Sequence, residues 1–349
     1  MQSDKSQKKS FAPLTKRIGV FFLGVFILIF AIVSLHVRAK KNDSRTIRFA
    51  AFNTVCGVTL YGKVTAAQED ALRELLVQMQ VLHDTLNVHA ADSELSRLNA
   101  TAAQSPFHCS DLLWDALLHT RDGVELTRLP EGGYAYDPTV GPLMRLWGFH
   151  GKRDTLPSPA EMSETLSRIG FSRITWDDAA HTVYFPVAGM ALDLGGMAKG
   201  YACHLAAQHL ERHGLKCYLL DFGGNIRLAD TPPKGRQEFT VGIREPGDRG
   251  GVLRTLELKG MTVSTSGNYE RYRMLGGRKV GHIMHPSTGE PCAYLASVTA
   301  ITADSTLADI FSTAVFVGGP TLAQELAKRV PETRFVIVPE VGQPPIDIP

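Results

Sequence analysis

An uninterrupted apolar run near the start of the chain divides it into two parts that must fold in different surroundings. Residues 18–37 carry no charged side chain, and a run of about 20 such residues is long enough to cross the hydrocarbon core of a bilayer. The basic side chains that precede it favour a cytoplasmic location for residues 1–17; they are Lys5, Lys8, Lys9, Lys16 and Arg17. Val37-Arg-Ala39 is a poor cleavage site for a signal peptidase. We therefore expect a transmembrane anchor at 18–37, with a cleaved signal sequence as the alternative.

The rest of the chain mixes helical and strand-like segments. Residues 38–46 read as a polar linker, 47–338 as one domain and 339–349 as a loose proline-rich tail. Apolar periodicity predicts helices and strands in several places: helices at 66–88 and 111–129, and strands within 47–61, 174–190, 239–243 and 253–258. Because the two kinds of element do not alternate regularly, the pattern predicts an α+β fold with two closely packed lobes.

Composition excludes some classes of partner. The formal net charge is +2, and basic and acidic residues are intermixed, so there is no nucleic-acid signature. The five cysteines are widely spaced, and no two of them form a C-x-x-C pair. We interpret them as small buried residues, not as a disulfide framework or a zinc site.

Asp309 and Thr313 stand four residues apart in a segment that reads as an apolar helix. Helical spacing puts a carboxylate and a hydroxyl on one face. Oxygen ligands with no His or Cys among them suit Mg²⁺, which usually takes further oxygens from water and from phosphates. A local hydrogen bond between the two side chains is the alternative.

Two glycine-rich segments could serve a phosphate. Residues 190–200 read as a strand ending at Leu194, a Gly195-Gly196 turn and a helix from Ala198, with Lys199 in its first turn. Such a helix start offers backbone N–H groups and the positive end of the helix dipole. Residues 218–226 form a second strand that runs into a diglycine. Each segment taken alone is explained equally well by a tight turn.

A third segment predicts a hairpin. Residues 261–272, the Gly276-Gly277 pair and residues 280–291 read as two strands joined by a turn, and the second strand ends near His282. A histidine there could be a general base, or a structural residue with its hydrogen bonds satisfied within the sheet.

Together these segments resemble the family of ApbE-type FAD:protein FMN transferases. The motifs occur in that family's order and spacing from about Phe52 to Gly319. In this chain they read Asp92-Ser-Glu-Leu-Ser-Arg-Leu-Asn99, Tyr134-Ala-Tyr-Asp-Pro-Thr-Val-Gly-Pro-Leu143, Asp193-Leu-Gly-Gly-Met-Ala-Lys-Gly-Tyr201, Phe222-Gly-Gly-Asn225, Ser264-Thr-Ser-Gly-Asn-Tyr269, His282-Ile-Met-His-Pro-Ser-Thr-Gly289 and Ala308-Asp309 to Thr313.

The resemblance implies roles for individual residues. Asp309 and Thr313 correspond to Mg²⁺ ligands, and Gly196 to a ligand through its carbonyl. His282 corresponds to the catalytic base. The positions that correspond to FAD contacts are Phe52, His89, Ala135, Tyr136, Asp137, Asp193, Lys199 and Ile283. The flavin site would lie between the two lobes.

The implied reaction transfers the FMN part of FAD to a Ser or Thr hydroxyl of an acceptor protein and releases AMP. An FAD pyrophosphatase and a non-catalytic flavin-binding redox protein are the alternatives. Acceptors of the family carry a motif ending in Gly-Ala-Thr or Gly-Ala-Ser, which is absent from this chain, so transfer would occur to another protein. We expect that partner to be a membrane redox subunit, met by a domain on the periplasmic side of a bacterial inner membrane.

Three positions depart from the family pattern. Phe52-Asn53-Thr54 stands where Met-Gly-Thr is usual, and His89 stands where Tyr is common. The aromatic rings of Phe52 and His89 can still offer a flat face to a flavin or adenine. The third departure is His285, in place of the Asp of a His-x-x-Asp-Pro motif. If that Asp orients a base or a turn, His285 must do so as a neutral donor or acceptor.

Overall fold

The structure is a computed structural model that describes residues 44–248, 250–269 and 271–349. The expected basic segment, membrane anchor and most of the expected linker lie outside these residues. Among the described helices, Ser305–Arg329 is long and apolar enough to cross a membrane by length and composition. However, 72% of its apolar window is buried inside the protein, as in the core helix of a globular domain.

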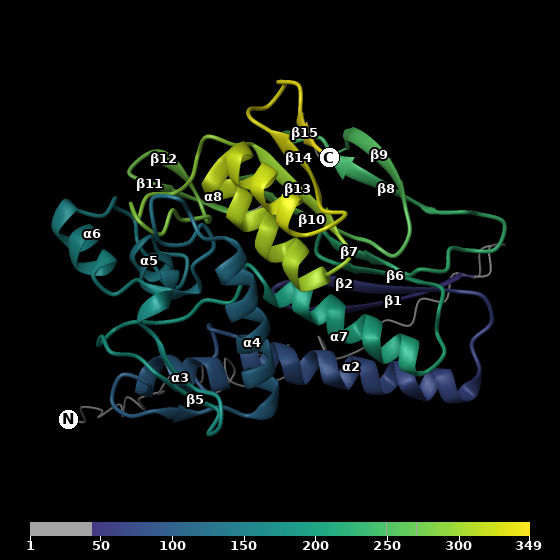
Figure 1. The fold of residues 1–349 in the computed structure, drawn as a ribbon, viewed down its shortest axis with the longest axis horizontal. Helices are drawn as coiled ribbons and strands as arrows, with labels where there is room; N and C mark the ends of the chain where they lie inside the picture. The colour runs from purple at the N-terminus through teal and green to yellow at the C-terminus, as the bar shows by residue number, and fades with distance from the viewer. Residues whose placement is uncertain (1–43, 249, 270) are drawn as a thin grey trace, which may run out of the picture. The chain divides into compact units, whose positions relative to one another are not determined.

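The core of the fold is an eight-stranded sheet with the order β1-β2-β6-β7-β10-β13-β14-β15 (Figure 1). Its strands are Ser44–Ala51 (β1), Thr54–Tyr61 (β2), Tyr218–Phe222 (β6), Asn225–Leu228 (β7), Thr262–Gly267 (β10), Ser297–Thr302 (β13), Arg334–Val338 (β14) and Ile346–Ile348 (β15). Every pairing among them is antiparallel. The predicted α+β class is therefore confirmed.

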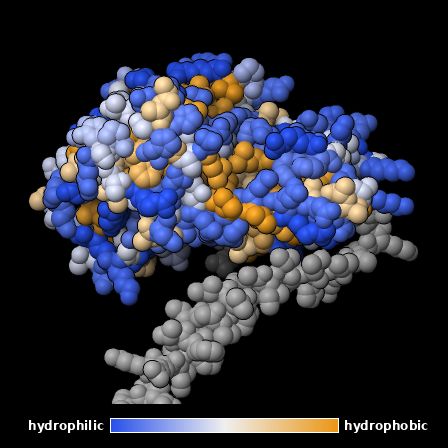
Figure 2. Space-filling model, turned by 90° about the horizontal axis from the view of Figure 1, so that it is seen from below, coloured by the Kyte–Doolittle hydropathy of each residue, from blue (hydrophilic) through white to orange (hydrophobic). Residues whose placement is uncertain are grey.

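The described residues form seven α-helices, and four of them cover this sheet in two layers. The helices are Ala66–Leu86 (α2), Glu94–Thr101 (α3), Asp111–Leu126 (α4), Gly141–Leu146 (α5), Pro159–Leu166 (α6), Ala198–Arg212 (α7) and Ser305–Arg329 (α8). α8 contacts β10 and β13, α7 contacts β6, and α2 and α4 pack on α7 from outside. Figure 2 shows the side of the molecule on which α2 lies as mainly hydrophilic, with a central apolar strip.

Three small antiparallel sheets complete the chain. They are β3-β5-β4, with strands Phe107–His108, Thr182–Tyr184 and Thr175–Asp177; β8-β9, with strands Phe239–Arg244 and Val252–Leu258; and β11-β12, with strands Tyr272–Leu275 and Arg278–Gly281. The predicted hairpin is thus formed by β11 and β12 alone. Thr262–Gly267, expected in its first arm, is instead β10 in the middle of the large sheet.

Local sequence explains where the long helices begin. Thr65 and Gln68 form a capping box before α2, with the Gln68 amide 3.3 Å from the Thr65 hydroxyl. Ser110 caps α4, and Asp304 caps α8 by accepting from two backbone amides. The predicted helices 66–88 and 111–129 are therefore confirmed, each ending two or three residues early.

The described residues form one compact unit. Most buried apolar side chains belong to one cluster between the sheet and the helices. A second, smaller cluster joins α5 to the β11-β12 hairpin and consists of Leu143, Met144, Trp147, Leu275, Val280 and Met284. The described residues therefore form a single unit with two apolar clusters of unequal size, and the expected division into two lobes stays a prediction.

Residues 190–194 do not form the predicted strand. Asn99 occupies both backbone groups of Leu192: its amide donates to the carbonyl oxygen at 2.9 Å, and its oxygen accepts from the N–H at 2.7 Å. The Asp193 amide donates to the carbonyl oxygen of Pro138 at 2.7 Å. These bonds replace those of a sheet partner, and the segment belongs to none of the described strands.

Both ends of the domain are more ordered than expected. Ser44–Thr46, predicted as linker, begin β1 and pair with Thr59–Tyr61. The tail is not loose throughout, because Ile346–Ile348 pair with Phe335–Ile337 and close the edge of the large sheet. Arg254 and Asp347 form an ion pair that ties the tail to β9.

Candidate active site

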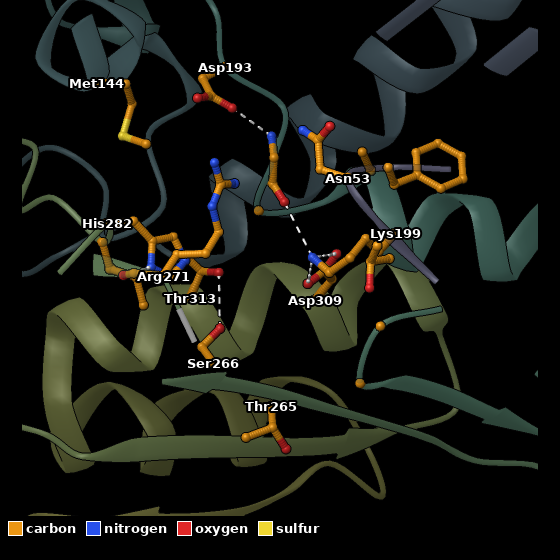
Figure 3. A pocket seen from close by; sticks show the side chains of 18 of the residues that line it. Asn53, Met144, Asp193, Lys199, Thr265, Ser266, Arg271, His282, Asp309 and Thr313 are labelled. Atoms are coloured by element: carbon orange, nitrogen blue, oxygen red, sulfur yellow. Dashed lines mark hydrogen bonds and ion pairs between the residues drawn. The ribbon is translucent and has the colours of Figure 1, made fainter. Parts of the chain in front are cut away.

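A cleft of about 890 Å³ runs between the sheet, α8 and the loops around them. Every residue to which the resemblance assigned a catalytic, metal or FAD role lines this cleft: Phe52, His89, Ala135, Tyr136, Asp137, Asp193, Gly196, Lys199, His282, Ile283, Asp309 and Thr313. Figure 3 shows Lys199 beside Asp309, Thr313 joined to Ser266, and His282 next to Arg271, with Asp193 at the opposite side of the view. The fold therefore brings together positions from across the whole domain.

Asp309 is the most enclosed acidic group near the centre of the cleft. Its side chain lies on α8 and the residue is 3% exposed. The Lys199 ammonium is 3.3 Å from both carboxylate oxygens, and the Gly200 amide donates to Oδ2 at 3.0 Å. The Ser264 hydroxyl lies 3.5 Å from Oδ1. The Lys199 ammonium already contacts this carboxylate, and so the position suits positive charge.

Thr313 lies one helical turn beyond Asp309 and faces the diglycine turn. A Cβ at Gly196 would be 3.2 Å from the Thr313 hydroxyl and 2.8 Å from the ring of Tyr136. Only glycine fits there without displacing its neighbours. The hydroxyl of Tyr136 is buried and has no hydrogen-bond partner within the described residues. An unpartnered buried hydroxyl beside these oxygens is what a site for a further polar group would contain.

The start of α7 offers fewer free amides than the sequence led us to expect. Met197 at the N-cap makes no side-chain cap. Four nearby amides are nevertheless engaged: Gly195 with Asp193, Met197 and Ala198 with the Leu194 carbonyl, and Gly200 with Asp309. Among the described residues the amides of Gly196 and Lys199 remain for a ligand, whereas the Lys199 ammonium contacts Asp309 and the Gly195 carbonyl oxygen.

Asp193 belongs to a chain of polar side chains that the sequence did not reveal. Its Oδ2 lies 2.9 Å from His150 Nε2, and the His150 ring meets the His89 ring edge-on, with centroids 5.0 Å apart. Burial would raise the pKa of Asp193, but the hydrogen bond and charge of His150 and the Gly195 amide outweigh it and lower the pKa. Burial, followed by the charge of His150, lowers the pKa of His89.

His282 follows directly after β12 and is held by a backbone carbonyl. Its Nδ1 is 3.1 Å from the Arg271 carbonyl oxygen. A carbonyl only accepts, so Nδ1 carries the hydrogen in the neutral ring and Nε2 carries the lone pair. Burial, reinforced by the charge of Arg271, lowers the pKa of His282 to about 4. The imidazole is therefore neutral near pH 7 and can accept a proton at Nε2.

His285 supports the turn that follows His282. Within the part of the chain that the structure describes, it makes no hydrogen bond to His282 itself. Its Nδ1 accepts from the Ser287 amide at 3.3 Å, and its carbonyl accepts from Gly289 at 2.8 Å. This is the hydrogen bond that an Asp makes in an Asx turn. His285 thus replaces the expected Asp as a neutral acceptor within the Pro-Ser-Thr-Gly turn.

Phe52 and Asn53 form the tight turn between β1 and β2. Their φ angles are 51° and 57°, which is the left-handed region. Asn is among the residues that tolerate this region best, which explains how it can stand where Gly is usual. The Phe52 amide donates to His83 Nδ1 at 3.1 Å, and the two rings meet edge-on.

Asp137 lines the cleft, but its carboxylate is engaged within the protein. Oδ1 accepts from the Thr139 amide at 2.8 Å and from its hydroxyl, and Oδ2 accepts from the Phe171 amide at 3.1 Å. Burial raises the pKa of Asp137 despite these bonds. The side chain caps the short helix at Pro138–Val140. We expected Asp137 to contact FAD, but both of its carboxylate oxygens already accept hydrogen bonds from the protein.

Several further polar residues of the cleft were missed from the sequence. They are Asp221, Arg244, Glu245, Asp248, Thr265, Ser266, His150 and Arg271. Thr265 and Ser266 lie within a segment that we had singled out, so their position was a usable signal. Arg271 also lies in a segment that we had singled out, 261–272, eleven residues before His282. His150 carries no local pattern, since its partner Asp193 lies in another segment of the chain.

This architecture defines an α+β protein with one polar cleft that combines a buried carboxylate, a lysine and a neutral histidine. The profile of the ApbE family matches residues 52–337, and the chain belongs to this family. It is 33% identical over 293 residues to an FAD:protein FMN transferase of Treponema pallidum, covering 80% of each chain. It is 30% identical over 290 residues to the FAD:protein FMN transferase of Salmonella typhimurium, covering 80% of this chain and 81% of the other.

Solved structures agree with this assignment. An ApbE protein of Thermotoga maritima superposes with a TM-score of 0.75 at 28% identity, over 84% of this chain and 94% of the other. The apo form of the flavinyl transferase ApbE of Pseudomonas stutzeri superposes with a TM-score of 0.74 at 26% identity, over 89% and 96% of the two chains.

Proposed function

We propose that this enzyme transfers the FMN moiety of FAD to a Ser or Thr hydroxyl of an acceptor protein and releases AMP. One observation carries the proposal: a neutral histidine with its lone pair on Nε2 and a carboxylate-hydroxyl pair suited to a hard cation line the same cleft. The names of the curated relatives supply the substrate class. Members of the ApbE family therefore offer the closest chemical precedent for this arrangement.

The donor set fits Mg²⁺. Asp309, Thr313 and the carbonyl of Gly196 would hold the ion, because all three positions are oxygen donors on adjoining walls of the cleft. Lys199, at 3.3 Å from both Asp309 oxygens, would then turn toward a phosphate. When bound, Mg²⁺ would neutralise the charge that develops on the pyrophosphate.

The protein's own residues account for the proton. The acceptor hydroxyl gives its proton to His282 Nε2, while Nδ1 keeps its hydrogen bond to the Arg271 carbonyl. The hydroxyl oxygen bonds to the FMN-side phosphorus, the bond from that phosphorus to the bridging oxygen breaks, and AMP leaves with that oxygen. A bound pyrophosphate would favour the protonated ring, because its negative charge opposes the effect of Arg271.

Cationic side chains would position the pyrophosphate. Lys199 and Arg271 both line the cleft, and Arg271 is exposed and adjoins His282. Two positive groups near a pyrophosphate lower the energy of its developing charge without taking part in proton transfer. We assign them to binding and charge stabilisation.

The acceptor would be a separate protein. This chain has no Gly-Ala-Thr or Gly-Ala-Ser tripeptide, so we infer transfer in trans. The apolar run at 18–37 leads us to place the domain at the outer face of a bacterial inner membrane, near membrane redox subunits. This placement stays a prediction from sequence.

Product analysis separates the proposal from its alternatives. The full chain in detergent is incubated with FAD and Mg²⁺, with and without an acceptor protein that carries the motif, and nucleotides are separated chromatographically. AMP that forms only when acceptor is present supports transfer. AMP together with free FMN, formed regardless of acceptor, indicates a pyrophosphatase, and intact FAD indicates a binding protein.

A further inference from the structure

The C-terminal end of α7 carries three potential metal ligands away from the cleft. His209 lies in the last turn of α7, His213 is the C-cap residue that follows it, and Glu74 lies on the neighbouring helix α2 (Figure 1). One donor atom of each of the three lies within 4.8 Å of those of the other two. None of the three residues lines the cleft.

Each imidazole is held by a backbone carbonyl through one ring nitrogen and keeps the other nitrogen for a ligand bond. His209 Nε2 is 2.7 Å from the Ala71 carbonyl oxygen, and His213 Nδ1 is 2.8 Å from the His209 carbonyl oxygen. Because carbonyls only accept, those two nitrogens carry hydrogens. His209 Nδ1 and His213 Nε2 are left with lone pairs. A backbone carbonyl on the second ring nitrogen is the usual support of a metal-bound histidine.

The burial of the three side chains is also compatible with a metal site. His209 is 2% exposed, so its ring is fixed between α2 and α7. Glu74 and His213 are exposed and can adjust to an incoming ion. The rings of His209 and His213 have centroids 4.4 Å apart and planes inclined by 34°. Burial is the main reason that the pKa of His209 is lowered, which keeps this ring neutral.

We propose that Glu74, His209 and His213 bind a divalent transition metal of the Zn²⁺ type. Two imidazoles and one carboxylate suit Zn²⁺, Ni²⁺ or Cu²⁺ and do not suit Mg²⁺, so the site is chemically distinct from the oxygen set at Asp309. A bound ion would join α7 to α2 and restrain the helix whose other end carries Lys199. The inference does not depend on the proposed transferase reaction.

Zn²⁺ binding to the full chain in detergent tests the proposal. Excess Mg²⁺ is kept present so that the oxygen site does not compete, and binding is followed by calorimetry and by the rise in the thermal unfolding midpoint. Glu74→Gln and His213→Gln remove one ligand each, and Gln at 213 can still donate to the His209 carbonyl. The exposed His108→Gln is the matched control.

We expect one Zn²⁺ per wild-type chain and a higher midpoint when Zn²⁺ is bound. Each ligand variant should lose at least tenfold in affinity, whereas His108→Gln should not. Co²⁺ should give a visible spectrum that disappears in His213→Gln. No Zn²⁺ binding, or equal affinity in wild type and in both ligand variants, would overturn the proposal and leave the two histidines as supports of the helix end.

Discussion

At the residue scale, one backbone carbonyl decides how His282 can act. The Arg271 carbonyl fixes the hydrogen on Nδ1, so Nε2 is the basic atom of a residue that lines the cleft. Burial and the Arg271 guanidinium keep the ring neutral by lowering its pKa to about 4, from an ordinary value near 6.5. The residue is therefore ready to accept a proton over a wide range of pH.

The lowered pKa of His282 predicts where activity falls at acid pH. The active form is the neutral ring, so kcat/KM should be constant above about pH 5 and fall as pH drops through the pKa near 4. His282→Asn should slow transfer by about a hundredfold or more and leave FAD affinity nearly unchanged. Steady-state rates and FAD binding by fluorescence measure both. An acid limb with a pKa near 6.5 would contradict the role of His282 as the base. Loss of FAD affinity with full turnover at saturation would contradict it as well.

Arg271 offers a matched test of the same point. Arg271→Gln keeps the carbonyl that holds His282 but removes the guanidinium charge. Because that charge is the second cause of the lowered pKa, the acid limb should move upward in this variant while burial still holds it below 6.5. An unchanged limb would mean that burial alone sets the pKa of His282.

Asp309 carries the corresponding prediction for the metal. Asp309→Asn keeps an oxygen for the Gly200 amide but removes the charge that faces the ion. We expect this variant and Asp309→Ala to lose Mg²⁺-dependent turnover, with the fold retained by circular dichroism, and Thr313→Val to need more Mg²⁺ while remaining active. Full turnover in either Asp309 variant would end the assignment.

At the element scale, the crossing of α7 and α8 builds the centre of the site. A Cβ at Gly200 would be 2.2 Å from the Ser305 carbonyl oxygen and 2.7 Å from Asp309 Cβ. The backbone of α7 therefore lies directly against the backbone and a side chain of α8. This close approach lets the Gly200 amide reach the Asp309 carboxylate. The position of the carboxylate therefore depends on how closely the two helices pack.

Substitution of Gly200 tests this dependence. Gly200→Ala should separate the helices, cost about 1–3 kcal/mol of unfolding free energy by overpacking and weaken Mg²⁺ dependence. Gly57→Ala is the control, since its nearest neighbour is a carbonyl oxygen at 3.8 Å. Chemical denaturation and Mg²⁺ titration measure the effect. Equal stability of the two variants would show that the crossing tolerates a methyl group.

The elements also show where prediction from sequence stops. α2 and α4 follow from periodicity and capping, and α7 and β6 from their apolar pattern, because these are local features. The false strand before Leu194 has apolar residues typical of a strand, but Asn99 takes both backbone groups of Leu192. A side chain nearly a hundred residues away leaves no trace in the local pattern.

At the scale of the whole molecule, the order of motifs indicated the site, and the fold determined its contents. The expected residues line one cleft, yet Asp137 uses its carboxylate as a helix cap and His150 enters beside Asp193. The cap made by Asp137 is a local contact with Thr139, strengthened by the more distant Phe171 amide, whereas His150 and Asp193 come from separate segments of the chain. The sequence indicates which segments meet, and it does not indicate which side chains satisfy one another when they do.

The membrane topology is a prediction at this same scale. If residues 18–37 span the membrane with the basic N-terminus inside, protease added to intact spheroplasts should remove the domain and spare the first residues. Immunoblotting against tags at either end measures the fragments. Protection of the domain until the membrane is broken would refute this orientation.

The most direct test of the account is the mass of the acceptor after reaction. The full chain is incubated with FAD, Mg²⁺ and a candidate acceptor, and the acceptor is analysed by intact and tandem mass spectrometry, with an acceptor whose target Ser or Thr is replaced by Ala as the control. The account predicts one FMN unit joined through phosphate to that hydroxyl, one AMP released for each transfer, and no product with Asp309→Asn or without Mg²⁺. An unmodified acceptor accompanied by free FMN or intact FAD would contradict it.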